Sequence, residues 1–552
     1  MAIEHVFVLM LENRAFDHML GFAGLKGTDP ITGQATKAVD LINITLRDVA
    51  RALHLTSARA MAKRLRLGAP ISLRELIQCI RSNVDWNGNR VLARTPADFK
   101  ITSTNEDLVF DPGHEFLNVL MQLCGTGTSY PEPGTRKYPS INNSGFIASY
   151  AAGPLPSSGP DGSPVPTKIM NCFAPEQVPV LVALAREFAV CDHWFSSMPG
   201  PTWPNRLFIH AASSAGLDDS PSGVDVVSAG LIDGFDFNNG TLYDHLSSRG
   251  LAFTIFEGDE FPQSRGIAGI DEDHFVDFDE FSARVSDSSF ASAYTFIEPN
   301  YGNDLPLSPE DFTCGNSQHP LDDITRGEKL VKTVYEAIRT SPHWEKSLLL
   351  VTYDEHGGFF DHLPPPTTVN PGDGIPDQDN NHHNFDFTQL GVRVPAVVVS
   401  PLIPRGTIDH TVYDHSSLLA TVETLFGLGP LTNRDRQSNN FTHLLSLPTP
   451  RTDTPTTLPN PADSGFRCPD DPGAGNSALS RTAPGTPGAV VNKPIPPALR
   501  GFLRVAFRRH YQLASAAEKP AAIAEFLAIK TKQDALEYMQ RVRAKVKGTL
   551  PS

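Results

Sequence analysis

Oxygen-bearing side chains follow two apolar runs of the sequence at the point where each run ends. Glu12 and Asn13 come directly after the first run, and Asp354 and Glu355 come directly after the second. If both runs are parallel strands, their carboxyl ends meet at the edge where ligands of open α/β sheets bind. Three carboxylates crowded there would repel one another, and a divalent cation would remove that repulsion.

The pattern therefore predicts a metal site with four oxygen ligands, Glu12, Asn13, Asp354 and Glu355. Hard oxygen ligands suit Ca²⁺, Mg²⁺ or Mn²⁺, and Zn²⁺ also accepts carboxylates, so the identity of the metal stays open. The alternative is that the two pairs are separate acidic loop starts with no common focus.

A threonine stands in the stiff turn Pro199-Gly200-Pro201-Thr202, before the helical pattern Trp203–Ser213. This order predicts Thr202 as the N-cap of a helix, with Pro204 in the first turn. Unpaired N–H groups and the positive dipole end make a helix N-terminus suitable for a phosphate. A metal-coordinated hydroxyl there can act as a nucleophile. The alternative is a capping threonine with no further role.

Two histidines lie in Gly- and Pro-rich loops and not on apolar faces. His114 follows Asp111-Pro112-Gly113, and His319 lies in Gly315-Asn316-Ser317-Gln318-His319-Pro320. Each could hold a phosphate oxygen or protonate a leaving group, or could simply be a surface histidine. Serine hydrolases and zinc proteases of the common kinds are disfavoured, because neither G-x-S-x-G nor H-E-x-x-H occurs.

Apolar runs predict the strands that must position these residues. The runs are Val6–Leu11, Ala252–Phe256, Ser347–Tyr353 and Val392–Val399. Helical patterns lie between them, for example at Val178–Phe188 and Gly327–Arg339. Alternation of this kind predicts an α/β fold with a mostly parallel central sheet and helices on both faces.

The chain divides into three predicted parts. Residues 1–446 form a catalytic domain, with a helical insert at about 37–110 that includes Leu46–Leu67 and Ser72–Ile80. The insert is either a lid over the site or a surface elaboration. Residues 447–497 are rich in Pro, Gly and Thr and predict a linker or wrapping loop. Residues 498–552 form a basic helical tail.

The tail has two interpretations. Residues 498–547 contain eleven Lys and Arg against four Asp and Glu, in a chain whose net charge is −16. Phe502, Val505 and Phe507 lie beside arginines and could contact anionic lipid, so peripheral membrane contact is possible. The other interpretation is a helix packed on the acidic domain.

Composition excludes some partners and leaves the compartment open. An acidic chain with a pI of about 5.5 would repel nucleic acid, so no nucleic-acid partner is expected. The six cysteines are scattered, without C-x-x-C spacing, and predict no disulfide framework. Neither a signal peptide nor an apolar run of 18 residues is visible. A cytoplasmic location or export by a non-classical route is therefore expected.

Six motifs occur in order along most of the chain. They are Glu12-Asn13-Arg14-Ala15-Phe16-Asp17-His18, Asp111-Pro112-Gly113-His114, Gly200-Pro201-Thr202-Trp203-Pro204-Asn205-Arg206, Gln318-His319-Pro320, residues 353–362 (YDEHGGFFDH) and Gly391-Val392-Arg393-Val394-Pro395. In these motifs the chain resembles the bacterial and fungal phosphoesterase family that contains phosphatidylcholine-preferring phospholipases C and the Francisella-type acid phosphatase. That family belongs to the alkaline-phosphatase-like fold. The resemblance covers roughly residues 3–428.

The resemblance implies roles for individual residues. Glu12, Asn13, Asp354 and Glu355 would bind the metal, and Thr202 would carry a phosphorylated intermediate. His114 and His319 would be histidines of the phosphate site. The sequence departs from the family pattern at Ala15, where many members have Ser, and in lacking an export signal.

The expected function is metal-dependent hydrolysis of a phosphate ester, most of all a phospholipase C reaction on a phospholipid. An acid phosphomonoesterase is the alternative, and a catalytically inactive lipid- or partner-binding module is the alternative of another class. Five aromatic residues near the motifs could line the approach of a lipid or could belong to the core: Trp194, Phe195, Trp203, Phe359 and Phe360.

Overall fold

The computed structural model describes eleven parts of the chain: residues 3–44, 73–85, 87–95, 111–135, 137–153, 165–221, 234–302, 314–374, 380–463, 495 and 497–549. The helix predicted at Leu46–Leu67 lies outside these residues. The second helix of the insert is present as α4 (Leu73–Ile80). The division into catalytic domain, linker and tail stays a prediction. Residues 447–463, the described start of the predicted linker, contain neither helix nor strand.

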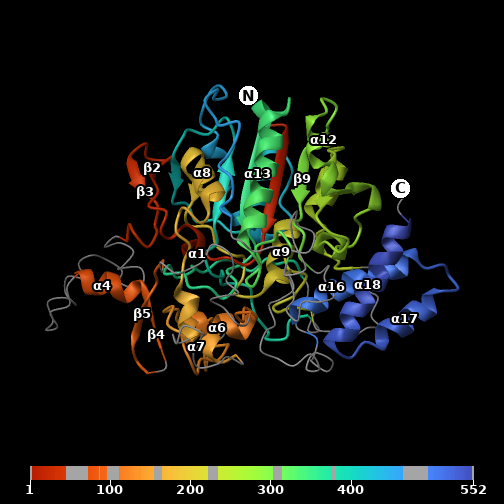
Figure 1. Ribbon diagram of the computed structural model, residues 1–552, viewed down its shortest axis with the longest axis horizontal. Coiled ribbons are helices and arrows are strands. Elements are labelled where there is room, and N and C mark those ends of the chain that lie inside the picture. The colour runs from red at the N-terminus through yellow and green to blue at the C-terminus, as the bar shows by residue number, and fades with distance from the viewer. Residues whose placement is uncertain are drawn as a thin grey trace.

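A sheet of ten strands forms the centre of the molecule (Figure 1). Its order is β3-β2-β12-β6-β11-β10-β1-β9-β7-β8, and most neighbouring pairs are parallel, as predicted. The strands are β1 (His5–Leu11), β2 (Lys26–Thr28), β3 (Ala35–Lys37), β6 (Ala189–Cys191), β7 (Phe253–Glu257), β8 (Phe275–Asp277), β9 (Tyr294–Ile297), β10 (Ser347–Tyr353), β11 (Ala396–Val399) and β12 (Thr407–Asp409). Two further strands, β4 (Ser82–Val84) and β5 (Arg90–Leu92), form a separate hairpin.

β1 and β10 decide where the site lies. Both strands are fully buried over seven residues, which explains their continuous apolar sequences. They are parallel neighbours in register, from His5 opposite Ser347 to Leu11 opposite Tyr353. Because both strands end at the same level, the residues that follow them emerge side by side.

One predicted strand is shorter than expected. The run Val392–Val399 yields β11 only from Ala396, and β11 pairs antiparallel with both β10 and β6. Pro395 directly precedes it and has no N–H for a strand ladder. Val392 and Val394 instead make backbone bonds with Ser196 and Trp194.

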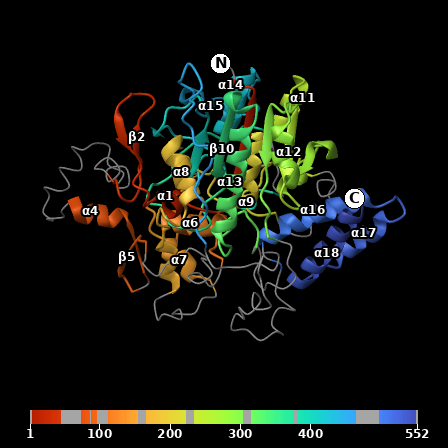
Figure 2. The same cartoon turned by 45° about the horizontal axis from the view of Figure 1, so that its top comes forward.

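Helices cover both faces of the sheet (Figures 1 and 2). α8 (Pro179–Glu187) and α13 (Ile324–Thr340) contact each other in front of it in Figure 1. In the second layer α9 (Thr202–Ala211) contacts both α11 (Leu242–Ser248) and α14 (Ser416–Phe426). The shorter helices are α1 (Phe16–Leu20), α6 (Phe116–Cys124), α7 (Phe146–Ala151), α12 (Phe281–Ser286) and α15 (Asn433–Gln437).

The C-terminal tail is helical, as predicted, and lies beside α9 (Figure 2). It consists of α16 (Pro497–Leu513), α17 (Lys519–Leu527) and α18 (Lys532–Thr549). Phe502, Val505 and Phe507 are buried there. Arg509 pairs with Glu272 at 2.6 Å. The structure therefore favours the second interpretation of the tail, a helix packed on the acidic domain.

Four cysteines are free, Cys79, Cys124, Cys172 and Cys191, whereas Cys314 is disulfide-bonded. A bonded Cys314 does not amount to the disulfide framework that the scattered spacing argues against. None of the helices in the described residues is long and apolar enough to cross a membrane.

Candidate active site

The four predicted metal ligands lie at one edge of the sheet. The backbone N–H of Asn13 donates to Asp354 Oδ1 at 3.2 Å. Glu12 and Glu355 are the neighbours of these two residues, and all four side chains are buried. The adjacent, aligned ends of β1 and β10 thus bring together residues that are more than 340 positions apart.

Two glycines allow the loop after β10 to approach its neighbours closely. Gly357 and Gly358 have φ of 62° and 72°, backbone angles that residues other than glycine rarely adopt. A Cβ on Gly357 would lie 2.2 Å from the carbonyl oxygen of Asn13. A Cβ on Gly358 would lie 2.7 Å from Cβ of Pro112, in the loop that carries His114. The glycines therefore let three motifs meet.

Thr202 reaches this edge from the start of α9. The helix begins at Thr202, and Pro201 is the N-cap, so the predicted N-cap was wrong by one residue. The reason is that the Thr202 hydroxyl does not fold back onto its own helix. It donates to Oδ1 of Asn13 at 3.2 Å. The nucleophile candidate and one metal-ligand candidate are therefore in direct contact.

Arg206 is a site residue that the sequence argument missed. It lies one helical turn after Thr202, and its Nε donates to Asp354 Oδ2 at 3.1 Å. Its guanidinium also lies 3.7 Å from Glu298 and over the ring of Tyr301. The buried guanidinium supplies some of the positive charge that the sequence argument gave entirely to a metal. Its place in the motif with Thr202 was the available signal.

Two carboxylate oxygens of the site have no hydrogen-bond partner in the described structure. They are Oε2 of Glu12 and Oε1 of Glu355, both buried. Burial, together with the charge of Asp354, raises the pKa of Glu12 well above its ordinary value. Burial likewise raises the pKa of Glu355 to about 8, and Asp354 adds to the shift. Unsatisfied buried oxygens of this kind fit a hard cation.

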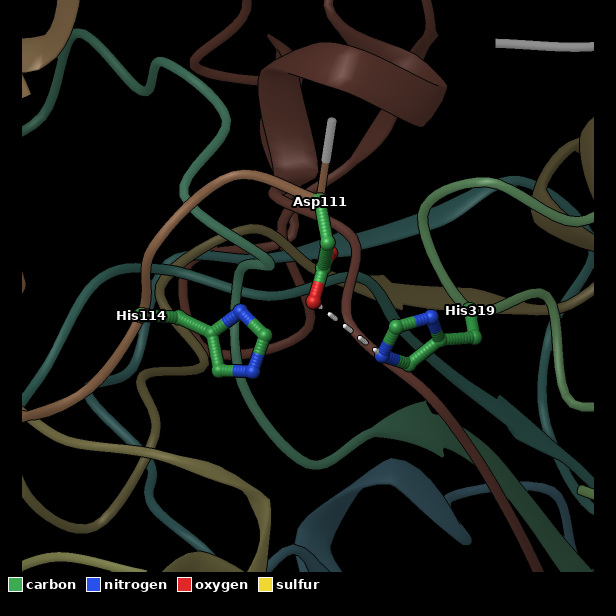
Figure 3. A group of neighbouring side chains, drawn as sticks. All are labelled: Asp111, His114 and His319. Carbon is green, nitrogen blue, oxygen red and sulfur yellow. Dashed lines mark ion pairs between the residues drawn. The ribbon is translucent and has the colours of Figure 1, made fainter. Parts of the chain in front are cut away.

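His114 and His319 face each other near the same edge, with Asp111 between them (Figure 3). Their ring centroids are 6.1 Å apart, and Nε2 of His319 lies 3.9 Å from Asp111 Oδ2. Nδ1 of His114 lies 2.9 Å from the carbonyl oxygen of Pro112, so this nitrogen carries a proton and donates it. Nε2 is the other ring nitrogen of His114, and in the neutral ring it can accept a hydrogen bond.

Arg14 fixes the His319 loop against the end of β1. Its Nε donates to the carbonyl oxygen of Gln318 at 2.6 Å, and its Nη2 donates to that of His319 at 3.0 Å. Burial, with the charges of His114 and Arg14, lowers the pKa of His319 well below its ordinary value. A neutral imidazole at His319 can accept or donate one hydrogen bond without adding charge.

His415 is a second residue that sequence reasoning missed. Trp194 Nε1 donates to Nδ1 of His415 at 3.3 Å. Nε2 of His415 therefore carries the proton and donates to the carbonyl oxygen of Asp354 at 2.6 Å. Burial lowers the pKa of His415 to about 4, which keeps this ring neutral. It holds the end of β10 in place.

Three groups in the described residues have acidic and imidazole atoms within 4.8 Å of one another and could hold a metal ion. They are Asp111–His114–His319, Asp192–His193–His410 and Asp17–Asp361–His362. The four ligands predicted from the strand ends are not among these groups. Their carboxylates share one edge without converging as tightly, and Arg206 is bonded to one of them.

The five aromatic residues near the motifs belong to the core. Trp194, Phe195, Trp203, Phe359 and Phe360 are at most 2% exposed. Trp194 donates to His415, and Phe359 packs on Arg14. They build the walls behind the site and do not form an open aromatic surface.

The chain is similar to known phosphate-ester hydrolases. Residues 3–429 match the model of the Phosphoesterase family. Non-specific phospholipase C6 of Arabidopsis thaliana is 35% identical over 480 residues, which is 83% of this chain and 75% of that protein. Phospholipase C A of Mycobacterium tuberculosis is 26% identical over 332 residues, 53% of this chain and 59% of that protein.

Solved structures give a weaker likeness. The phosphonate monoester hydrolase of Agrobacterium radiobacter has 12% sequence identity, with 49% of this chain and 72% of that chain covered, and a TM-score of 0.29. That score is too low to carry an argument about this chain.

Proposed function

The chain belongs to the phosphoesterase family and is a phosphoric ester hydrolase, and on this premise we propose that it is a phospholipase C with Thr202 as its nucleophile. The observation that supports the nucleophile is the contact of the Thr202 hydroxyl with Asn13, beside the buried carboxylates. The names of the relatives that cover most of the chain support a phospholipid diester as the substrate.

Thr202 is the first residue of α9, a helix of ten residues. The N–H groups of its first turn have no partner within the helix and can donate to phosphate oxygens. In the proposed reaction the Thr202 oxygen attacks phosphorus in line and displaces the alcohol. Water then hydrolyses the phosphothreonine. Positioning and charge stabilisation would supply most of the rate.

The two facing histidines would act on the phosphate and on the leaving group. His319, neutral and buried, would hold a phosphate oxygen. His114 is oriented by its bond to Pro112, which leaves Nε2 of the neutral ring unprotonated, so Nε2 would take the proton of the attacking Thr202 hydroxyl and then pass it to the leaving oxygen. Both lie in loops that are fixed to the ends of β1 and β10.

A divalent metal ion would be held by Glu12, Asn13, Asp354 and Glu355. Oε2 of Glu12 and Oε1 of Glu355 lack other partners, which supports this choice of ligands. When bound, the metal would stabilise charge on the phosphate and lower the pKa of a coordinated hydroxyl. Ca²⁺, Mg²⁺, Mn²⁺ and Zn²⁺ all accept such ligands.

A phospholipid substrate requires contact with a lipid surface. Phe502, Val505 and Phe507 of α16 are buried, so a peripheral contact through the tail would use exposed basic residues such as Arg541 and Lys545. The acidic chain has no expected nucleic-acid partner. An acid phosphomonoesterase stays the alternative within the same chemistry, and an inactive lipid- or partner-binding module is the alternative outside it.

Hydrolysis of p-nitrophenyl phosphorylcholine and p-nitrophenyl phosphate, measured side by side, tests the proposal. Thr202→Ala should lose at least about 10³-fold in kcat on the choline diester, because the nucleophile is removed. Chelator should abolish the activity of the wild type, and added metal should restore it. Thr424→Ala is a matched control, since its hydroxyl bonds only within α14.

The two substrates separate the candidate functions. Turnover of the monoester alone would identify a phosphatase. Full activity of Thr202→Ala would refute the assigned nucleophile. No turnover of either substrate by metal-replete wild type would leave the inactive binding module as the better account.

A further inference from the structure

Two neighbouring strands carry residues of metal-binding types directly after their last residues. β6 is parallel to β12 and in register with it, so that Cys191 lies opposite Asp409. The ladder continues by one step, because the N–H of Asp192 donates to the carbonyl oxygen of Asp409 at 3.1 Å. Asp192 and His193, which follow β6, therefore emerge beside His410, which follows β12.

Both imidazoles turn the same nitrogen toward one carboxylate. Nδ1 of His193 lies 2.6 Å from Oδ1 of Asp192, and Nδ1 of His410 lies 2.9 Å from Oδ2 of that residue. The ring centroids are 6.0 Å apart and the ring planes nearly perpendicular, at 82°. Ligand atoms of a tetrahedral zinc site lie roughly 3.3 Å from one another. The two rings therefore need only small rotations to admit an ion.

The charges at this place favour a cation. Burial alone would raise the pKa of Asp192, but hydrogen bonds from His193 and His410 outweigh burial and lower that pKa. Asp192 is therefore ionised, as a metal ligand must be. Burial would lower the pKa of His410, but the neighbouring carboxylates, that of Asp192 above all, outweigh burial and raise it. Both shifts show surroundings that stabilise positive charge.

Two other groups in the described residues contain the same ligand types. The group with His114 belongs to the proposed active site. The group with Asp17 already contains a cation, because Arg393 donates to Asp17 at 2.9 Å and to Asp361 at 3.2 Å. At Asp192 the guanidinium of Arg393 instead donates to the backbone carbonyl oxygen, at 2.9 Å. The Asp192 carboxylate accepts from imidazoles, and an imidazole can exchange its proton for a metal ion, which a guanidinium cannot.

The position of His410 allows an ion to enter from solvent. The side chain of His410 is 29% exposed, whereas that of His193 is buried. Nε2 of His410 lies 2.8 Å from the hydroxyl of Thr36 in β3, and a hydroxyl can either donate to a ring nitrogen or accept from it. This bond therefore persists when a metal replaces the proton on Nδ1. Partners of this kind orient the histidines of metal sites.

We propose that Asp192, His193 and His410 form a second metal site, which binds Zn²⁺ and fastens the β2–β3 hairpin to the sheet. Two nitrogen ligands and one oxygen ligand suit Zn²⁺, whereas hard cations prefer sites made of oxygen ligands. The inference does not rest on the proposed function. β11 separates β6 from β10 in the sheet, and none of the three residues is assigned to the reaction.

The hairpin is the part of the sheet that such an ion would stabilise. β2 and β3 lie at one end of the sheet (Figure 1), and β2 meets β12 through one residue pair, Thr28 opposite Thr407. The bond between Thr36 and His410 adds a second attachment. The N–H of Val39, just after β3, donates to Oδ2 of Asp192 at 2.7 Å. An ion on Asp192 and His410 would fix both attachments.

Zinc binding to the metal-free full chain, measured by titration calorimetry, tests the site. His410→Asn keeps an amide N–H near the position of Nδ1 but removes the imidazole ligand. The wild type should bind one more Zn²⁺ than His410→Asn, whatever the active site binds, and both should bind the same number of Ca²⁺. His443→Asn is the matched control, because His443 is 34% exposed and pairs with Asp409. It should bind zinc as the wild type does.

A second variant keeps all three ligands. Thr36→Val removes the hydroxyl that orients His410, and zinc affinity at the site should fall by about 10-fold. It replaces His410→Asn if that variant fails to fold. Equal zinc binding by the wild type and the folded variants overturns the site. Loss of one ion in His443→Asn as well would indicate adventitious binding by surface histidines and also overturns it.

Hydrogen exchange tests the structural role. Peptides covering residues 26–37 should exchange more slowly when Zn²⁺ is added to the wild type or to His443→Asn, but not when it is added to His410→Asn. Zinc binding without this protection overturns the fastening of the hairpin. Neither readout depends on turnover. If the wild type hydrolyses neither substrate, the proposed function fails, and the zinc count still decides the second site.

Discussion

Two buried clusters of this molecule are built from the same parts and differ in one respect. Each places a buried arginine beside buried carboxylates. The first surrounds Arg206 and contains Glu12, Asp354 and Glu355. The second surrounds Arg393 and contains Asp17, Asp361 and His362.

Every carboxylate oxygen of the Arg393 cluster has a donor. Asp17 accepts from Arg393 Nη2 at 2.9 Å and from His362 Nδ1 at 2.7 Å. Asp361 accepts from Arg393 Nε at 3.2 Å and from the N–H of Leu363 at 2.9 Å. Burial alone would raise the pKa of Asp17, but the charges of His362 and Arg393 outweigh it and lower that pKa.

The Arg206 cluster is left incomplete. One oxygen of Glu12 and one of Glu355 have no donor in the described structure, and the pKa of both groups is raised. The comparison teaches that buried carboxylates do not by themselves indicate a site. Completed hydrogen bonding indicates a structural cluster, and incomplete hydrogen bonding of the same residue types indicates a place for a ligand.

The largest expected effect is a loss of activity when the incomplete Arg206 cluster is changed. Glu355→Gln keeps the shape of the side chain but removes the charge of a proposed metal ligand, so kcat/KM should fall by about 10³-fold. Unfolding of the metal-free variant in urea should show no loss of stability, because a neutral amide is easier to bury. Metal affinity, measured by titration calorimetry, should fall as well.

Glu4→Gln is the control for this change, because Glu4 forms an exposed pair with Lys346. An active Glu355→Gln that binds metal as the wild type does would remove the distinction between the two clusters.

The next largest effect is a loss of folding stability when the fully hydrogen-bonded Arg393 cluster is changed. Arg393→Met leaves Asp17 and Asp361 buried without their cation, and loss of one partner of a buried pair costs about 3–5 kcal/mol. Urea unfolding at pH 7 measures this cost. Arg284→Met should change stability by less than about 0.5 kcal/mol, because its pair with Glu280 is exposed. Similar small effects for both variants would contradict the structural role of Arg393.

The smallest effect is a pH dependence that distinguishes the clusters. A carboxyl whose pKa is raised by folding binds more protons in the folded state, so stability falls as pH rises between its unfolded and folded values. Without metal, the free energy of unfolding should fall between pH of about 4.5 and about 8 because of Glu355. In the Arg393 cluster, burial raises the pKa of Asp361 to about 6, so its contribution to the fall in stability ends at a pH of about 6.

Denaturant unfolding at a series of pH values checks this slope. Glu355→Gln should reduce this slope, although Glu12, whose pKa is also raised, keeps contributing to it. Bound metal should oppose the slope, because the metal favours the ionised carboxylate. An unchanged slope in Glu355→Gln would assign the titration to other groups.

The site could be predicted wherever a local pattern carried it. Apolar runs ending in acidic residues located β1 and β10, and with them Glu12, Asn13, Asp354 and Glu355 at one edge. Arg206 and His415 were missed, because the residue type does not show which carboxylate or carbonyl the side chain will meet, and only the motif shared with Thr202 marked Arg206. The metal-binding and catalytic roles of the predicted residues stay predictions.

The sequence by itself determined the strand cores, the helical tail and the chemical types of the site residues, because periodicity and burial are properties of neighbouring residues. The tertiary structure decided what those residues touch. Thr202 bonds Asn13, Arg206 bonds Asp354, and Gly501 of a distant helix lies against Trp203. These contacts join residues between 148 and 298 positions apart, and only close packing in three dimensions fixes which of them form.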